Sequence, residues 1–217
     1  MNNKYDIYFW DLDGTISNSQ EGIFNSIKYA LDKLNLEHPS QEVLNSFIGP
    51  PLYVSFMKHW FPNDEEMGHK AVAYYREYYA DKGIYENTNY EGINEVLESI
   101  KSKGATLILA TAKPTQYAKI VIEHAKVDHL FSEVYGSNMD GSRSSKVEII
   151  RDIFKDYPEF KFKKCVMIGD RYYDLKGAQH HNIDGIGVLY GFGTKEELEA
   201  ESPVAIVTKP DDFMSLI

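Results

Sequence analysis

Short, almost continuously hydrophobic runs recur along the chain and alternate with longer amphipathic stretches. The first run, Tyr5–Trp10, is rich in aromatic and β-branched residues, which is typical of a strand buried on both faces in a parallel sheet. Runs of similar character follow at Thr106–Ala110, Glu133–Tyr135, Cys165–Ile168, Ile186–Leu189 and Val204–Val207. We therefore predict a strand at each of these places.

Helical periods fill the stretches between these runs. Apolar residues between Ile93 and Ile100 share one face of a helix, and Gly104 provides a typical helix end. Pro114 stands where another helix should begin, and the apolar stripe of that helix continues to Ala125. Because strands alternate with helices, we predict an α/β fold with a doubly wound, Rossmann-like parallel sheet and right-handed crossovers.

One long interval breaks this alternation. Between Ser17 and Tyr90 the pattern predicts only helices, with apolar stripes over residues 23–34 and 71–78. A single crossover rarely needs more than ~40 residues. We therefore predict an inserted α-helical cap domain over residues 17–90 and an α/β core of residues 1–16 and 91–217. The alternative is that these helices simply cover one face of the sheet.

Composition and charge narrow the classes of function. The 217 residues, 43% hydrophobic and 26% charged, are ordinary for a globular protein with one large domain or a core and a smaller module. The net charge of −10 repels polyanions, so we expect neither nucleic-acid polymers nor membranes as partners. A small phosphate ester remains a candidate, because backbone amides, a metal ion and one lysine can outweigh the overall charge locally.

The sequence also indicates a compartment. The single cysteine, Cys165, cannot form an internal disulfide, which fits a reducing environment. The first residues lack the features of a signal peptide, and no apolar run approaches the ~20 residues that span a bilayer. We expect a cytoplasmic monomer or small homo-oligomer.

Polar clusters follow the predicted strands and begin one of the helices. Residues 11–15 (DLDGT) follow the first strand, residues 111–114 (TAKP) follow Thr106–Ala110, and residues 169–174 (GDRYYD) follow Cys165–Ile168. A fourth cluster, residues 143–146 (RSSK), opens a helix. Because ligands bind at the carboxyl ends of the strands in open α/β sheets, we expect these clusters to converge.

The residue types in these clusters suit phosphoryl chemistry. Asp11, Asp13 and Asp170 offer hard oxygen ligands that need a counter-charge, for which Mg²⁺ is the natural candidate. Thr111 and Lys146 add donors for an anionic ligand. An ionised carboxylate can attack phosphorus, and a second carboxyl two residues on can protonate the leaving oxygen. Each residue alone has a plain structural explanation, such as a helix N-cap, and only their common order favours a site.

With these motifs in this order, the chain resembles a haloacid dehalogenase (HAD) superfamily phosphatase that has a helical cap after its first motif. The DLDGT run matches the first motif, Thr111 the second, Lys146 the third, and the run from Asp170 to Asp174 the fourth. The phosphoglycolate-phosphatase-like branch, which includes 5′-nucleotidases, is the most similar. Three further stretches support that branch: Phe47–Pro51, Gly136–Lys146 and Gly187–Gly193. Asn18 departs from the Asp of many relatives, which leaves substrate detail open.

The resemblance implies roles for the acidic residues. Asp11 would attack phosphorus and form an aspartyl-phosphate. Asp13 would protonate the leaving alkoxide and then act as a base on the hydrolytic water. Mg²⁺ would be held by Asp11, by the backbone carbonyl of Asp13 and by Asp170.

The resemblance also assigns the remaining motif residues. Thr111, Ala112 and Lys146 would bind the phosphate group, and Asp174 would orient Lys146 or a metal-bound water from behind. Substrate specificity is expected from the cap, where we single out Gly49, Pro50 and Arg76.

The predicted function is therefore a Mg²⁺-dependent phosphomonoester hydrolase that acts on a small phosphorylated metabolite. Two alternatives remain open at this point. A phosphosugar mutase of the same superfamily would use the same chemistry but keep the phosphoryl group. A phosphorylatable receiver-type signalling domain would also use an Asp, a Thr, a Lys and Mg²⁺.

Overall fold

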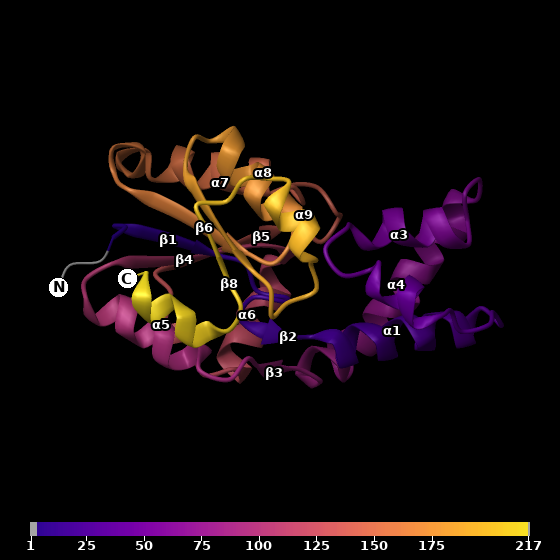
Figure 1. Ribbon diagram of the computed structural model, residues 1–217. Coiled ribbons are helices and arrows are strands. Elements are labelled where there is room, and N and C mark those ends of the chain that lie inside the picture. The colour runs from indigo at the N-terminus through magenta and orange to yellow at the C-terminus, as the bar shows by residue number, and fades with distance from the viewer. Residues whose placement is uncertain (1–3, 217) are drawn as a thin grey trace. The chain divides into compact units, whose positions relative to one another are not determined.

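The computed structural model describes residues 4–216, and the chain divides into two compact units (Figure 1). One unit contains the residues up to Asn18 and from Asn89 onward, and the other contains Ser19–Thr88. Two short strands lie where the chain passes between them, β2 (Ser17–Asn18) and β3 (Thr88–Asn89), and these pair with each other. The sequence analysis predicted no strand here, because two residues are too few to show a hydrophobic period.

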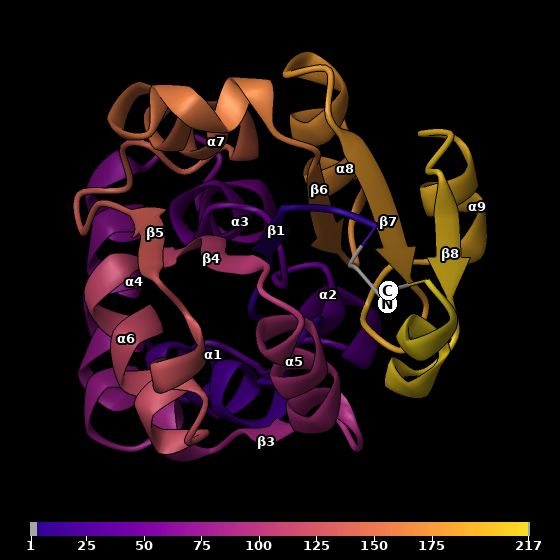
Figure 2. The same cartoon turned by 90° about the vertical axis from the view of Figure 1, so that its left-hand side faces the viewer.

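The first unit is built on a six-stranded parallel sheet, which confirms the predicted α/β fold. Figure 2 shows its strands from left to right in the order β5-β4-β1-β6-β7-β8. Every neighbouring pair is parallel. The strands are β1 (Ile7–Trp10), β4 (Thr106–Pro114), β5 (Glu133–Ser137), β6 (Cys165–Gly169), β7 (Asp184–Val188) and β8 (Ala205–Val207).

The strand order reverses at β1, since later strands are added on both of its sides. A reversal of this kind opens a crevice at the carboxyl ends of the strands, and it places that crevice directly beyond Trp10. Trp10 pairs with Leu109 on one side and with Ile168 on the other. The residues that follow these three therefore meet at one edge of the sheet.

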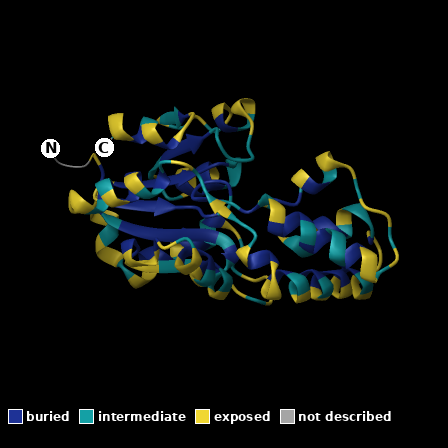
Figure 3. Cartoon of the chain, turned by 90° about the horizontal axis from the view of Figure 1, so that it is seen from below, coloured by how far each residue is buried: buried dark blue, intermediate teal, exposed yellow. Residues whose placement is uncertain are grey.

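Helices cover both faces of this sheet, with α7 and α8 on one face and α5 and α6 on the other (Figures 1 and 2). Between the helices and the sheet lies an apolar core that includes Phe9, Ile108, Ile150 and Met167 (Figure 3). The helical segments are α5 (Ile93–Ser102), α6 (Thr115–His124), η2 (Asp128–Leu130), α7 (Lys146–Asp156), η3 (Pro158–Phe162), α8 (Tyr172–His180), α9 (Lys195–Glu199) and η4 (Pro210–Ser215).

The second unit consists of helices: α1 (Gln20–Lys33), α2 (Gln41–Asn45), α3 (Leu52–His59), α4 (Glu65–Asp81) and η1 (Gly83–Tyr85). Aromatic side chains make up much of its core. Phe47 and Phe56 pack edge to face at 5.1 Å, and Tyr75 stacks on Tyr79 at 5.5 Å. Across the two units, none of the described helices is both long enough and apolar enough to cross a bilayer.

Candidate active site

A tight turn after β1 presents Asp11 at the switch point of the sheet. Asp11 Oδ1 accepts a hydrogen bond from the backbone N–H of Leu12 at 2.8 Å, which fixes the carboxylate at the strand end. The turn needs glycine at position 14, because φ is +83° there and a Cβ atom would lie 2.1 Å from Asp170 Oδ2. The DLDG sequence thus brings the first motif against the fourth.

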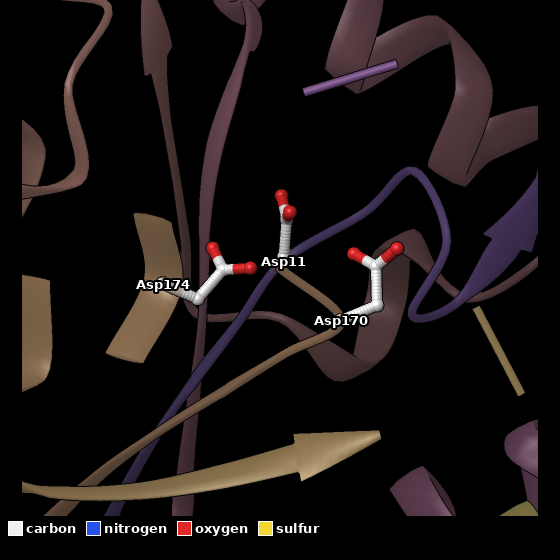
Figure 4. Close-up of side chains that lie close together, drawn as sticks. All are labelled: Asp11, Asp170 and Asp174. Carbon is white, nitrogen blue, oxygen red and sulfur yellow. The ribbon is translucent and has the colours of Figure 1, made fainter. Parts of the chain in front are cut away.

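Three carboxylates meet at this edge of the sheet (Figure 4). Asp11 follows β1, Asp170 follows β6, and Asp174 lies in the first turn of α8. One oxygen from each lies within 4.8 Å of the others, and all three residues are buried. Asp174 therefore lies in the same group of carboxylates as Asp11 and Asp170, the two carboxylates predicted to bind the metal.

Lys146 bridges two of these carboxylates. Its Nζ lies 2.7 Å from Asp11 Oδ1 and 2.9 Å from Asp174 Oδ1, and it also donates to the carbonyl oxygen of Ala110 at 2.5 Å. Lys146 is the first residue of α7, and a capping box formed by Ser145 and Glu148 fixes this helix start. All three protons of the ammonium group therefore have a partner.

Burial and repulsion shift the proton affinities of these groups. Burial, together with the charges of Asp174 and Asp11, raises the pKa of Asp170 well above its ordinary value. Burial raises the pKa of Asp174 to about 6, although the Lys146 ammonium opposes this. Burial also disfavours the charged form of Lys146, but Asp11 and Asp174 outweigh it and raise the pKa of the lysine. The positive charge of Lys146 alone therefore does not offset the negative charge of the three carboxyl groups.

The residues of the site fit a hard divalent cation such as Mg²⁺. Oxygen is the donor that Mg²⁺ prefers, and a cation would offset the repulsion among the carboxylates. Asp170 Oδ1 and Asp13 Oδ1 are buried and have no hydrogen-bond partner among the described residues. Such orphaned oxygens are costly unless something binds them. The buried acidic group is therefore able to hold a metal ion.

Asp13 lies beside a residue that the sequence analysis left without a role. Its Oδ2 is 2.9 Å from Nζ of Lys113, and the lysine side chain is only 6% exposed. The backbone N–H of Lys113 donates to Oγ1 of Thr111 at 3.3 Å. The sequence offered little signal for this contact, because the pairing of β4 with β5 is irregular between Ala110 and Pro114 and strand alternation does not hold there.

The loop after β7 packs against the fourth motif. The sequence analysis named Gly187–Gly193 as support for the resemblance but gave it no role at the site. The backbone N–H of Phe192 donates to Asp170 Oδ2 at 2.8 Å. A Cβ atom at Gly191 would lie 2.2 Å from the carbonyl oxygen of Gly14, and one at Gly193 would lie 1.9 Å from that of Asp170. The YGFG sequence therefore permits the close approach that fixes Asp170.

The other predicted site residues lie as follows. Thr111 is buried in β4, and Ala112 beside it is half-buried. Trp10 pairs with Leu109, so the residues that follow them, Asp11 and Ala110, lie at the same edge of the sheet. Thr111 comes directly after Ala110 in β4. Gly49, Pro50 and Arg76 belong to the helical unit, and their roles stay predictions.

The sequence that forms this site matches a known protein family. The family described as haloacid dehalogenase-like hydrolase matches residues 8–188. The chain belongs to this family. The family and the enzyme class predicted from the DLDGT, Thr111, Lys146 and Asp170–Asp174 motifs are thereby confirmed at the level of the family.

Known relatives support the same branch. A 5′-nucleotidase from Pseudomonas aeruginosa is 41% identical over 92% of this chain and 90% of its own. The tyrosine-protein kinase PtkA from Mycobacterium tuberculosis is 29% identical over 92% of this chain and 67% of its own. A predicted phosphatase from Clostridium acetobutylicum, known as a crystal structure, is 41% identical with a TM-score of 0.90 and 97% of both chains covered. Phosphoglycolate phosphatases are more distant relatives.

Proposed function

We propose that the protein is a Mg²⁺-dependent phosphomonoester hydrolase that works through an aspartyl-phosphate on Asp11. The observation that carries this proposal is a buried group of three carboxylates, Asp11, Asp170 and Asp174, of which Asp11 and Asp174 pair with the buried ammonium group of Lys146. When bound, Mg²⁺ would supply positive charge that draws the phosphate group in and offsets the charge of its oxygens. Asp11, Asp170 and the backbone carbonyl of Asp13 are the groups proposed to hold it.

Asp11 is placed to act as the nucleophile. Lys146 and the Leu12 N–H both bind Oδ1, which leaves Oδ2 to attack phosphorus. The new Oδ2–P bond forms as the ester P–O bond breaks, and the electron pair of that bond leaves with the alkoxide. Lys146 orients the Asp11 carboxylate through the ion pair at 2.7 Å.

Asp13 is proposed to move the proton in both half-reactions. Its carboxyl gives a proton to the departing alkoxide, and its carboxylate then takes one from the water that attacks the aspartyl-phosphate. Lys113, 2.9 Å from Asp13 Oδ2, holds this side chain in one orientation. Its positive charge suits the second half-reaction, in which the Asp13 carboxylate acts as the base. Thr111, Ala112 and Lys146 are proposed to bind the oxygens of the phosphate group, and Asp174 to orient Lys146.

Nucleoside 5′-monophosphates are the substrates we propose ahead of phosphoglycolate and sugar phosphates. The 41% identity to a 5′-nucleotidase over nearly the whole chain supports this order. The test is release of inorganic phosphate from adenosine monophosphate, phosphoglycolate, glucose 6-phosphate and p-nitrophenyl phosphate, with Mg²⁺ and with EDTA. Repeated turnover that stops in EDTA supports the proposal.

Other outcomes of the same assay would contradict it. A single stoichiometric phosphorylation of the protein without turnover would support a receiver-type domain. Movement of phosphate between sugar hydroxyls without release would support a mutase. Undiminished hydrolysis after complete removal of divalent cations would rule out the acidic group as the metal site.

A further inference from the structure

A pocket of about 600 Å³ lies at the amino-terminal edge of the sheet in the α/β unit. Residues that precede β1 and residues at the start of β6 and β7 line it, together with parts of α7 and η3. Asp11 and Asp170 follow the opposite ends of β1 and β6, and a five-residue strand is roughly 16 Å long. The pocket is thus separate from the candidate active site, and its volume is typical of sites that take small molecules.

The charge of this pocket is opposite to that of the chain. Four lysines line it, Lys4, Lys161, Lys163 and Lys164, against one carboxylate, Asp184. That carboxylate already accepts a hydrogen bond from the Tyr5 hydroxyl at 2.6 Å. The lining is therefore cationic in a protein whose net charge is −10.

Among the described residues, none of these four lysines forms a salt bridge, and the Lys4 ammonium lies 5.3 Å from the centroid of the Tyr5 ring. The nearby Asp6 carboxylate accepts the backbone N–H of Lys164 at 2.9 Å instead. Positive charges that gather without a carboxylate partner repel one another, and an anion bound among them would reduce that repulsion.

The floor of the pocket is apolar. Tyr5, Phe154 and Cys165 are buried there, and Phe160 lies partly exposed beside them. Phe160 is held by stacking on Tyr157, with ring centroids 5.0 Å apart. A cationic rim around an apolar and aromatic floor suits a ligand that carries both negative charge and a flat apolar part.

We propose that this pocket binds a small organic polyanion with a planar apolar portion, the chemistry of a nucleoside diphosphate. The lysines of the rim bind the phosphates, and the floor takes the ring. The neighbouring Phe162, 90% exposed between two lysines, also suits an anionic membrane surface. We favour the small ligand because the lysines surround a hollow rather than a flat face. The proposal does not depend on the phosphatase function.

Isothermal titration calorimetry on the full chain tests this site. Adenosine diphosphate is the ligand, and EDTA is present so that the cation-free carboxylates of the active site repel the anion and no turnover occurs. Pyrophosphate and adenosine are titrated separately to divide the contributions of phosphate and ring. The pocket variant is Lys161→Glu with Lys164→Glu, and the control is Lys103→Glu with Lys119→Glu, two exposed lysines elsewhere on the same unit.

Wild type and control should bind adenosine diphosphate with the same affinity, and the pocket variant should bind it at least about tenfold more weakly. Adenosine alone should bind more weakly than the diphosphate. Absence of binding to the wild type at millimolar concentration would overturn the proposal, as would equal affinity in the pocket variant. Binding to vesicles with 30% phosphatidylserine that the pocket variant loses, without nucleotide binding, would assign the lysines to a membrane surface instead.

Discussion

The two units differ most clearly in what they bury. Buried charged side chains are confined, among the described residues, to the α/β unit: Asp11, Lys113, Lys146, Asp170 and Asp174. The buried polar side chains of the helical unit are Ser19, Ser26 and Ser55. Burying a charge is costly unless it is paired, so a fold that gathers five of them at one sheet edge gives up stability there.

The comparison suggests a division of labour. In the α/β unit the buried charges lie around Asp11, the proposed nucleophile. Lys146 pairs with Asp11 and Asp174, and Lys113 pairs with Asp13. In the helical unit, aliphatic and aromatic side chains fill the core, and among its described residues it holds no comparable group of buried charges. We therefore expect changes at the site of the first unit to affect all alkyl phosphates alike, and changes in the second unit to alter the preference among them.

The largest effect is expected at the nucleophile. Asp11→Asn keeps nearly the same volume but removes the attacking oxygen, so turnover should fall by at least about 10⁴-fold for all phosphate esters. Circular dichroism and thermal melting should show a folded protein. Activity within a few-fold of the wild type would rule out covalent catalysis by Asp11.

The next effect concerns the proton donor. Asp13→Asn should slow hydrolysis of alkyl phosphates by ~10²–10⁴-fold, because a poor leaving group needs a proton. The loss should be smaller with p-nitrophenyl phosphate, whose leaving group departs without one. Equal losses with both esters, without accumulation of phosphorylated protein in a rapid-quench experiment, would remove Asp13 from this role.

A smaller effect is expected at Lys113. Lys113→Met preserves much of the side-chain volume but lets the Asp13 carboxylate leave its orientation, so kcat for alkyl phosphates should fall by roughly 10–100-fold with little change in KM. The matched control is Lys119→Met, an exposed lysine on α6. A loss of the same size for p-nitrophenyl phosphate would mean that Lys113 serves folding rather than Asp13.

The smallest effect is expected in the helical unit. Pro50→Ala, in the loop where Gly49 has a φ of +108°, should change the ratio of kcat/KM between adenosine monophosphate and phosphoglycolate by about two- to tenfold. The dependence of the activity on Mg²⁺ should not change. Lys70→Ala, on the exposed surface of α4, serves as the control. If kcat/KM fell by the same factor for all substrates, specificity would lie elsewhere than in this loop. The proposed division of roles between the two units would then lose its support.

Much of the α/β unit follows from sequence because its signals are local. A strand buried on both faces, such as Cys165–Gly169, must be continuously hydrophobic, and a turn such as 11–15 needs its own glycine. The order of the parallel strands then brings their carboxyl ends together, so the motif residues and the family were predictable without a structure. The limits of β2 and β3 were not, since two-residue strands are set by their pairing partner rather than by periodicity.

What only the tertiary structure decided are the partners between segments far apart in the chain. Lys113 next to Asp13 and the Phe192 amide on Asp170 join segments from different strands and loops. The resemblance gave Lys146 as one of two possible partners of Asp174, and the structure shows that contact at 2.9 Å. The four lysines of the amino-terminal pocket are likewise dispersed in the sequence, where each resembles an ordinary solvated residue. Hydrophobic periodicity fixes which face of an element is buried, but the distance between two charges depends on how several elements pack, and that information is not local.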